Sequence, residues 1–198
     1  MKKVVLLALA LVVTHVITAQ TEKGNLLLSG ATGLQFLSTN TDIEYDGQSQ
    51  GDFDQSSFSF TPGIGYFVMD NLAVGLTANF ESLTQKDSGD KYTLSTTAIL
   101  PSVTYYLPLD SKLRPYAQVA FGVVSAKEKE TFNGATSESK FNGTGLALGA
   151  GVSYFINTTV ALDFGVAYGG NNLKNSDDSD LVQNSRTFGA NIGFSLFL

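Results

Sequence analysis

The chain has 198 residues, with 12 Lys or Arg, 18 Asp or Glu, one His and no Cys. The net charge of −6 and the lack of a basic stripe argue against nucleic acid as a partner, and the length fits one domain or two small ones. An exported chain of this size without cysteine has to be stabilised by backbone pairing or burial alone.

The first segment has the pattern of a secretory signal peptide. Lys2-Lys3 precedes a largely apolar run over residues 4–17, which ends shortly before the small residue Ala19. The run is short for a membrane-spanning helix. We therefore predict a signal peptide over residues 1–19 and a mature domain over residues 20–198. Loss of the two lysines moves the net charge from −6 to −8.

The remainder alternates apolar stretches with polar connections. Most charges fall into four segments, at residues 42–54, 86–91, 127–140 and 174–186. Between the apolar stretches, short turns alternate with these long polar segments. Read at period two, the pattern predicts eight antiparallel strands connected up and down. Their expected positions are residues 25–38, 57–68, 72–82, 92–107, 113–125, 141–155, 160–169 and 186–198.

A weak internal repeat supports this topology. Four seven-residue segments share one frame, at residues 62–68, 101–107, 150–156 and 190–196. The first three run into a short turn and the fourth runs to the end of the chain, so four strands point the same way. Each carries a ring at the same place, at Tyr66, Tyr105, Tyr154 and Phe194. Rings at that place are expected to form an aromatic girdle at a membrane interface.

The two faces of the predicted strands differ in side-chain size and charge. One face is large, apolar and uncharged, as at Phe164, Val166 and Tyr168, whereas the other is rich in glycine and holds the charges of the strand bodies. An eight-stranded barrel has a narrow interior, so the small face is expected inside and the bulky face against lipid. The fold class predicted is all-β, an eight-stranded antiparallel up-and-down transmembrane β-barrel. We expect serine at Gly75, on the lumen side, to be tolerated better than arginine at Val74.

Three stretches carry a resemblance to a known family. They are Gly65-Tyr-Phe-Val-Met-Asp-Asn-Leu-Ala-Val-Gly75, Leu113-Arg-Pro-Tyr-Ala-Gln-Val-Ala-Phe-Gly122 and the terminal Phe194-Ser-Leu-Phe-Leu198. They resemble small eight-stranded outer-membrane barrels of the OmpA/OmpX-like outer membrane protein β-barrel family. The resemblance implies the outer membrane of a Gram-negative bacterium, periplasmic short turns, and the lipid bilayer and the assembly machinery, through the C-terminal strand, as partners. A monomer is expected.

The family's roles vary, so the resemblance is weak for function. We expect a structural or surface-interaction role through four long external loops. The alternative is a narrow, porin-like channel for small solutes.

Three charges on the lumen face are the candidate site. Arg114 and Asp163 lie near the short-turn ends of their strands, with Gly151 and Ser153 on the strand between them. A buried charge needs a partner, so we expect Arg114 and Asp163 to pair as a structural plug, with a gate as the alternative. Glu81 lies at the opposite end of the lumen.

No catalytic, cofactor or metal site is predicted, and the protein is not expected to be an enzyme. The only histidine, His15, is removed with the signal peptide, which excludes Ser–His, Cys–His and histidine-based zinc sites. Gly143-Thr-Gly-Leu-Ala-Leu-Gly149 has one residue too many for a dinucleotide fingerprint, and its glycines share the lumen face. The acidic residues at 42–46 and 177–180 match no defined calcium loop.

Overall fold

The computed structural model describes residues 21–32, 39–45, 48–87, 90–109, 111–177 and 181–198, without the side chains of 32–55 and 87. The predicted signal peptide therefore lies outside the described residues. Among these residues, no helix has the length and apolar character needed to cross a membrane.

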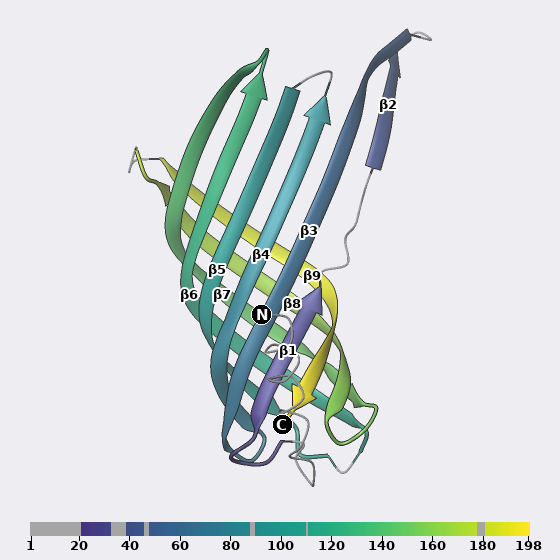
Figure 1. Cartoon of the computed structure of the whole chain (residues 1–198), viewed down its shortest axis with the longest axis vertical. Coiled ribbons are helices and arrows are strands. Elements are labelled where there is room, and N and C mark those ends of the chain that lie inside the picture. The colour runs from purple at the N-terminus through teal and green to yellow at the C-terminus, as the bar shows by residue number, and fades with distance from the viewer. Residues whose placement is uncertain (1–20, 33–38, 46–47, 88–89, 110, 178–180) are drawn as a thin grey trace, which may run out of the picture.

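Nine antiparallel strands are described, and eight of them form a closed ring (Figure 1). They are β1 (Leu26–Thr32), β2 (Thr39–Tyr45), β3 (Gln48–Met69), β4 (Leu72–Asp87), β5 (Asp90–Tyr106), β6 (Leu113–Phe132), β7 (Ala135–Phe155), β8 (Val160–Asn175) and β9 (Val182–Phe197). The ring runs from β3 through β9 and closes through β1, which pairs with both β9 and β3. Strand β2 pairs with the upper half of β3, beyond the ring.

Several strands are longer than predicted, because polar segments expected as loops are paired. Strands β6 and β7 have 20 and 21 residues and continue through the predicted loop 127–140 to a tight turn at Asn133 and Gly134. These two residues have positive φ angles of 49° and 81°, as the turn of a two-residue hairpin requires. The polar ribbon lacks the apolar alternation on which the prediction relied. We name residues 127–140 the external ribbon.

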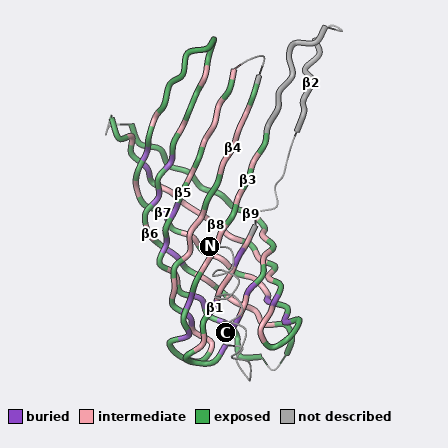
Figure 2. The backbone as a smooth tube through the Cα atoms, viewed as in Figure 1, coloured by how far each residue is buried: buried purple, intermediate pink, exposed green. Residues whose placement is uncertain are grey.

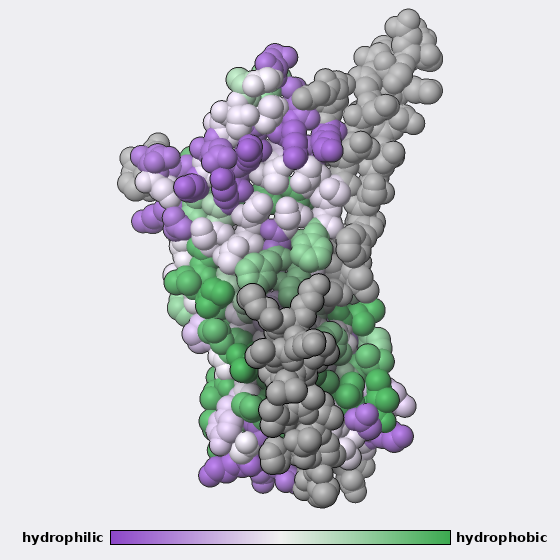
Figure 3. All heavy atoms as spheres, in the orientation of Figure 1, coloured by the Kyte–Doolittle hydropathy of each residue, from purple (hydrophilic) through white to green (hydrophobic). Residues whose placement is uncertain are grey.

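The faces of the strands are arranged as predicted. Large apolar side chains on the outer face are exposed, among them Phe60, Val74, Phe121, Phe164 and Ile192. Buried positions alternate with them along the strands near the short turns (Figure 2). In the space-filling view, apolar side chains gather between two more polar ends on the visible face of the molecule (Figure 3). The outward apolar stretch of β6, residues 113–123, has the length that a tilted strand needs to cross a membrane.

The inner face at Gly75 is more crowded than expected, and the comparison of serine there with arginine at Val74 stays a prediction. A Cβ atom at Gly75 would collide with the backbone carbonyl oxygen of Ile64 on the neighbouring strand β3. The backbones of β3 and β4 approach closely there, so glycine is needed for strand contact rather than for space in the lumen. Serine at Gly75 is therefore expected to disturb the sheet itself.

Two clusters of buried side chains occupy the lumen at different heights. The cluster near the short turns contains Leu27, Phe67, Ala73, Tyr106, Phe155, Ala161 and Phe197. The second, toward the external ribbon, contains Ala98, Leu100, Ala120, Val124, Ala126, Phe141 and Leu173. The inside of the barrel is thus a packed core at both levels.

Candidate functional site in the barrel lumen

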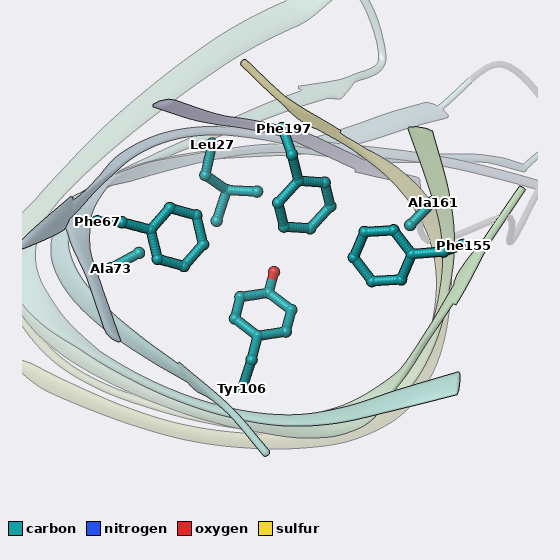
Figure 4. Close-up of a cluster of buried hydrophobic side chains, with 7 residues drawn as sticks. All are labelled: Leu27, Phe67, Ala73, Tyr106, Phe155, Ala161 and Phe197. Atoms are coloured by element: carbon teal, nitrogen blue, oxygen red, sulfur yellow. The ribbon is translucent and has the colours of Figure 1, made fainter. Parts of the chain in front are cut away.

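Four inward rings fill the lumen near the short turns. Phe67, Tyr106, Phe155 and Phe197 come from β3, β5, β7 and β9, and each is at most 3% exposed. The Phe197 ring centroid lies 4.8 Å from that of Phe155, 5.7 Å from Tyr106 and 6.2 Å from Phe67. These separations are typical of packed aromatic pairs. We name these four residues the aromatic plug, and Figure 4 shows their rings facing one another across the lumen.

The sequence analysis missed the aromatic plug, although a signal was present. In three of the four repeated segments, a second ring directly follows the outward one: Tyr66-Phe67, Tyr105-Tyr106 and Tyr154-Phe155. Because side chains alternate along a strand, the second ring of each pair has to point inward. The fourth inward ring, Phe197, directly follows the fourth segment and lies three residues after Phe194.

The carboxylate of Asp163 lies beside the plug and is held by two serines. Its Oδ1 accepts a hydrogen bond from Ser153 Oγ at 2.5 Å, and its Oδ2 accepts one from Ser195 Oγ at 2.6 Å. Both serines are buried, on the strands that flank β8. Hydroxyl donors on both oxygens compensate part of the cost of burying the carboxylate. The two serines were not predicted as site residues.

Arg114 occupies the same row of the lumen as Asp163. Arg114 on β6 is paired with Ser153 on β7, which is paired with Asp163 on β8. Two strand spacings separate the backbones of the two charged residues by about 10 Å. Among the described residues no ion pair joins them, and Ser153 lies between them in the row. The guanidinium carbon of Arg114 lies 5.3 Å from the centre of the Phe155 ring.

The segment before β1 closes over this end of the barrel. The hydroxyl of Thr21 makes two hydrogen bonds: Oγ1 donates to Asn71 Oδ1 at 2.6 Å and accepts from Arg114 Nη1 at 2.5 Å. The carbonyl oxygen of Thr21 accepts a third hydrogen bond, from the backbone N–H of Asn71 at 2.6 Å. The backbone N–H of Lys23 donates to Asp70 Oδ1 at 2.9 Å. These bonds hold the turn at Asn71, whose φ of 65° is uncommon for a residue other than glycine. We name residues 21–25 the N-terminal clamp.

The third predicted charge lies elsewhere. Glu81 is exposed, and its partners in the sheet are Ser59 and Thr96, several rows above Arg114 and Asp163. Between the two ends, polar side chains bond across strands. Gln118 Nε2 donates to Thr104 Oγ1 at 3.0 Å, and Asn79 Nδ2 donates to Thr61 Oγ1 at 3.0 Å.

The four rings predicted to form a girdle lie on the outer face near the short-turn ends of their strands. Tyr66, Tyr105, Tyr154 and Phe194 are each between 41% and 49% exposed. Gly30 lies opposite Phe194, where the position of a Cβ atom would be 3.2 Å from the ring. The girdle role itself stays a prediction.

The external ribbon carries charges of both signs. Lys127 Nζ lies 2.8 Å from Glu138 Oε2, and Lys129 Nζ lies 3.7 Å from Glu138 Oε1. The hydrogen bond from Lys127 lowers the pKa of Glu138 below its ordinary value. Nowhere in the described part of the chain do three His, Cys, Asp or Glu side chains gather as a metal site would require. The acidic side chains at 42–46 and the residues 178–180 lie outside the described part.

Comparison with known proteins points to one family. The chain matches the family described as "Outer membrane protein beta-barrel domain" over residues 4–195. Among solved structures, OprG from Pseudomonas aeruginosa is 18% identical with a TM-score of 0.51, over 92% of this chain and 99% of that one. Neisserial surface protein A is 19% identical with a TM-score of 0.49, over 87% and 95%. No curated protein matches the chain.

Proposed function

Because the chain belongs to the outer membrane protein β-barrel family, we propose that it is a closed barrel with a structural or surface-interaction role carried by its external end. It is a small β-barrel of the outer membrane of a Gram-negative bacterium, in a family of non-catalytic barrels. Its outer face is therefore in contact with the lipid bilayer. In the proposed orientation the short turns face the periplasm and the external ribbon faces outward.

The aromatic plug is the observation that carries the proposal. Its four rings come from four strands around the ring and pack against one another in the lumen, whereas the second buried cluster, with Leu100, Val124 and Phe141, comes only from β5–β8. A conducting pore of this strand number would need a continuous polar path past the four rings. The external end, in contrast, offers a paired ribbon with exposed charged side chains such as Lys129 and Glu138. Other molecules could bind these exposed charged side chains while the aromatic plug in the lumen stays in place.

The inward charges support a structural role for the lumen. Asp163 is bonded to two buried serines, and Arg114 joins β6 to the N-terminal clamp through Thr21. We propose that the row Arg114–Ser153–Asp163 fixes the arrangement of the barrel at its periplasmic end. This row would act together with the aromatic plug and not as a gate.

Conductance in planar bilayers tests the proposal against the alternative of a small-solute channel. We expect the purified wild-type barrel to give no current steps above those of lipid alone. The double variant Phe155→Ala, Phe197→Ala removes two rings of the plug and is expected to conduct. The matched control, Phe164→Ala, removes a ring from the outer face and is expected to stay closed. Current steps from the wild type would reject the closed barrel and favour the channel.

A further inference from the structure

A groove crosses the outer face of the barrel over β4, β5 and β6. It is a shallow, open groove of about 610 Å³, lined by apolar side chains that include Val74, Val103, Val119 and Phe121. The three valines form one row across the strands, because Val74 is paired with Val103 and Val103 with Val119. Larger side chains border this row, with Tyr105 two residues below Val103 and Phe121 two residues above Val119. Short side chains between large ones produce the hollow.

Pro101 explains why the hollow lies at this place. On β5, Ile99 is paired with Val123 and Ser102 with Ala120, but no pair is formed between these two. Proline has no N–H to donate, so the ladder between β5 and β6 is interrupted there. The interrupted part of the ladder lies in the sheet that forms the groove, because Pro101 is one of the lining residues.

The position of the groove decides what can fill it. The groove opens onto the apolar zone that meets the bilayer, where no water is available. If the groove were empty, the side chains that line it would lose van der Waals contacts on their open side. A hydrocarbon chain restores these contacts and is therefore the favoured occupant. Val103 lies two residues above Tyr105, and Pro101 lies four residues above it. At about 3.3 Å per residue and a tilt near 40°, the groove lies roughly 5–10 Å from the ring of Tyr105, within the nearer half of a hydrocarbon core about 30 Å thick.

A cation lies in the short connection below the groove. The connection between β5 and β6, two of its three strands, carries Lys112, which is exposed. The same connection exposes the apolar side chains of Leu107 and Leu109. An exposed lysine just outside the hydrocarbon core attracts the phosphate of a lipid head group, while the leucines face its glycerol and upper acyl region.

We propose that this groove binds one acyl chain of a phospholipid of the periplasmic leaflet, with the lipid phosphate near Lys112. The choice of leaflet rests on the orientation proposed above, in which Tyr105 and the short turns are periplasmic. The binding itself depends only on the shape and position of the groove. Its failure would leave the closed lumen and the conductance result unaffected.

Native mass spectrometry of the purified barrel in detergent, after addition of phosphatidylglycerol, tests the proposal. We expect the wild type to retain one phospholipid per chain. Val103→Phe fills the groove with a ring and is expected to reduce retention at least fivefold. Val166→Phe adds the same ring to an exposed position on β8, outside the groove, and is expected to retain the lipid as the wild type does. Folding of each variant is checked by its resistance to unfolding in cold sodium dodecyl sulfate.

Further variants keep the test decisive. If Val103→Phe does not fold, Val119→Phe fills the same hollow from β6 and takes its place. Lys112→Gln is expected to weaken retention of phosphatidylglycerol without changing the fold. Wild-type protein that retains no phospholipid, or equal retention by the groove variant and Val166→Phe, would overturn the proposal. Retention of lipopolysaccharide in preference to phosphatidylglycerol would overturn the choice of leaflet.

Discussion

At the scale of single residues, the hydroxyl of Thr21 connects parts of the chain that are far apart in sequence. It donates to Asn71 and accepts from Arg114, so both of its hydrogen-bonding roles are used. Thr21→Val keeps the shape of the side chain but removes both bonds from a buried site. We expect a loss of about 1–3 kcal/mol in the free energy of unfolding, measured in urea with lipid vesicles present. Glu22→Gln, on the neighbouring exposed residue, is the control and is expected to change little. An equal loss for both variants would contradict the clamp.

The row Arg114–Ser153–Asp163 gives a second prediction. Arg114→Met and Asp163→Asn each remove one charge and keep most of the side-chain volume. Since Ser153 lies between the two residues in one row, we expect the two losses of stability to be non-additive by at least about 0.5 kcal/mol in a double-mutant cycle. The measurement is the midpoint of urea unfolding for the wild type, both single variants and the double variant. Simple additivity would mean that the two charges act separately.

Residues also show how far the sequence could lead. Period-two alternation was sufficient to assign the faces of the strands, because lipid selects large apolar side chains on one of them. It placed Arg114 and Asp163 in one row, with Ser153 between them. It could not give their partners, because Thr21 and Ser195 reach the site from the two ends of the chain. Such contacts depend on how the ring closes, which no local pattern encodes.

At the scale of elements, the external ribbon was predicted as a loop and is a hairpin. The Asn133-Gly134 pair is a strong local signal for a hairpin turn. It was not used in the prediction because the segments on either side of it lack the alternation of apolar and polar residues that indicates a strand. Its stability rests on backbone pairing and on weak surface ion pairs such as Lys127–Glu138. Substitutions in this turn are therefore expected to reveal the backbone conformation that the turn requires more directly than the packing of side chains.

The turn gives a test at the same scale. Gly134 has a φ of 81° with no atom near the place of a Cβ, so alanine there is strained by backbone conformation alone. We expect Gly134→Ala to speed amide hydrogen exchange across residues 127–140 and to leave the melting temperature of the barrel unchanged. Ser137→Ala, at an exposed strand position of the ribbon, is the control and should exchange as the wild type does. A lowered melting temperature would show that the ribbon and the ring unfold together.

At the scale of the whole molecule, the barrel consists of a packed half near the short turns and a more polar half toward the external ribbon. The aromatic plug, the N-terminal clamp and the Asp163 network all lie at one end, where the strands meet short turns. The strands extend past the apolar zone at the other end, as in β6 and β7. The end near the short turns thus carries the side-chain contacts that link distant strands, and we expect changes of sequence or length in the external ribbon to leave the ring closed.

The seam formed by β1 sets an order of events during assembly. Strand β1 joins β3 on one side and β9 on the other, and the backbone N–H and carbonyl of Leu26 bond to those of Leu198. These contacts link the two most distant parts of the sequence, so they carry the largest loop-closure entropy and form late. Until they form, β1 and β9 both present open edges that hydrocarbon cannot satisfy. We therefore expect closure of the ring to be faster when another surface pairs with or shelters those edges while the last strands come together.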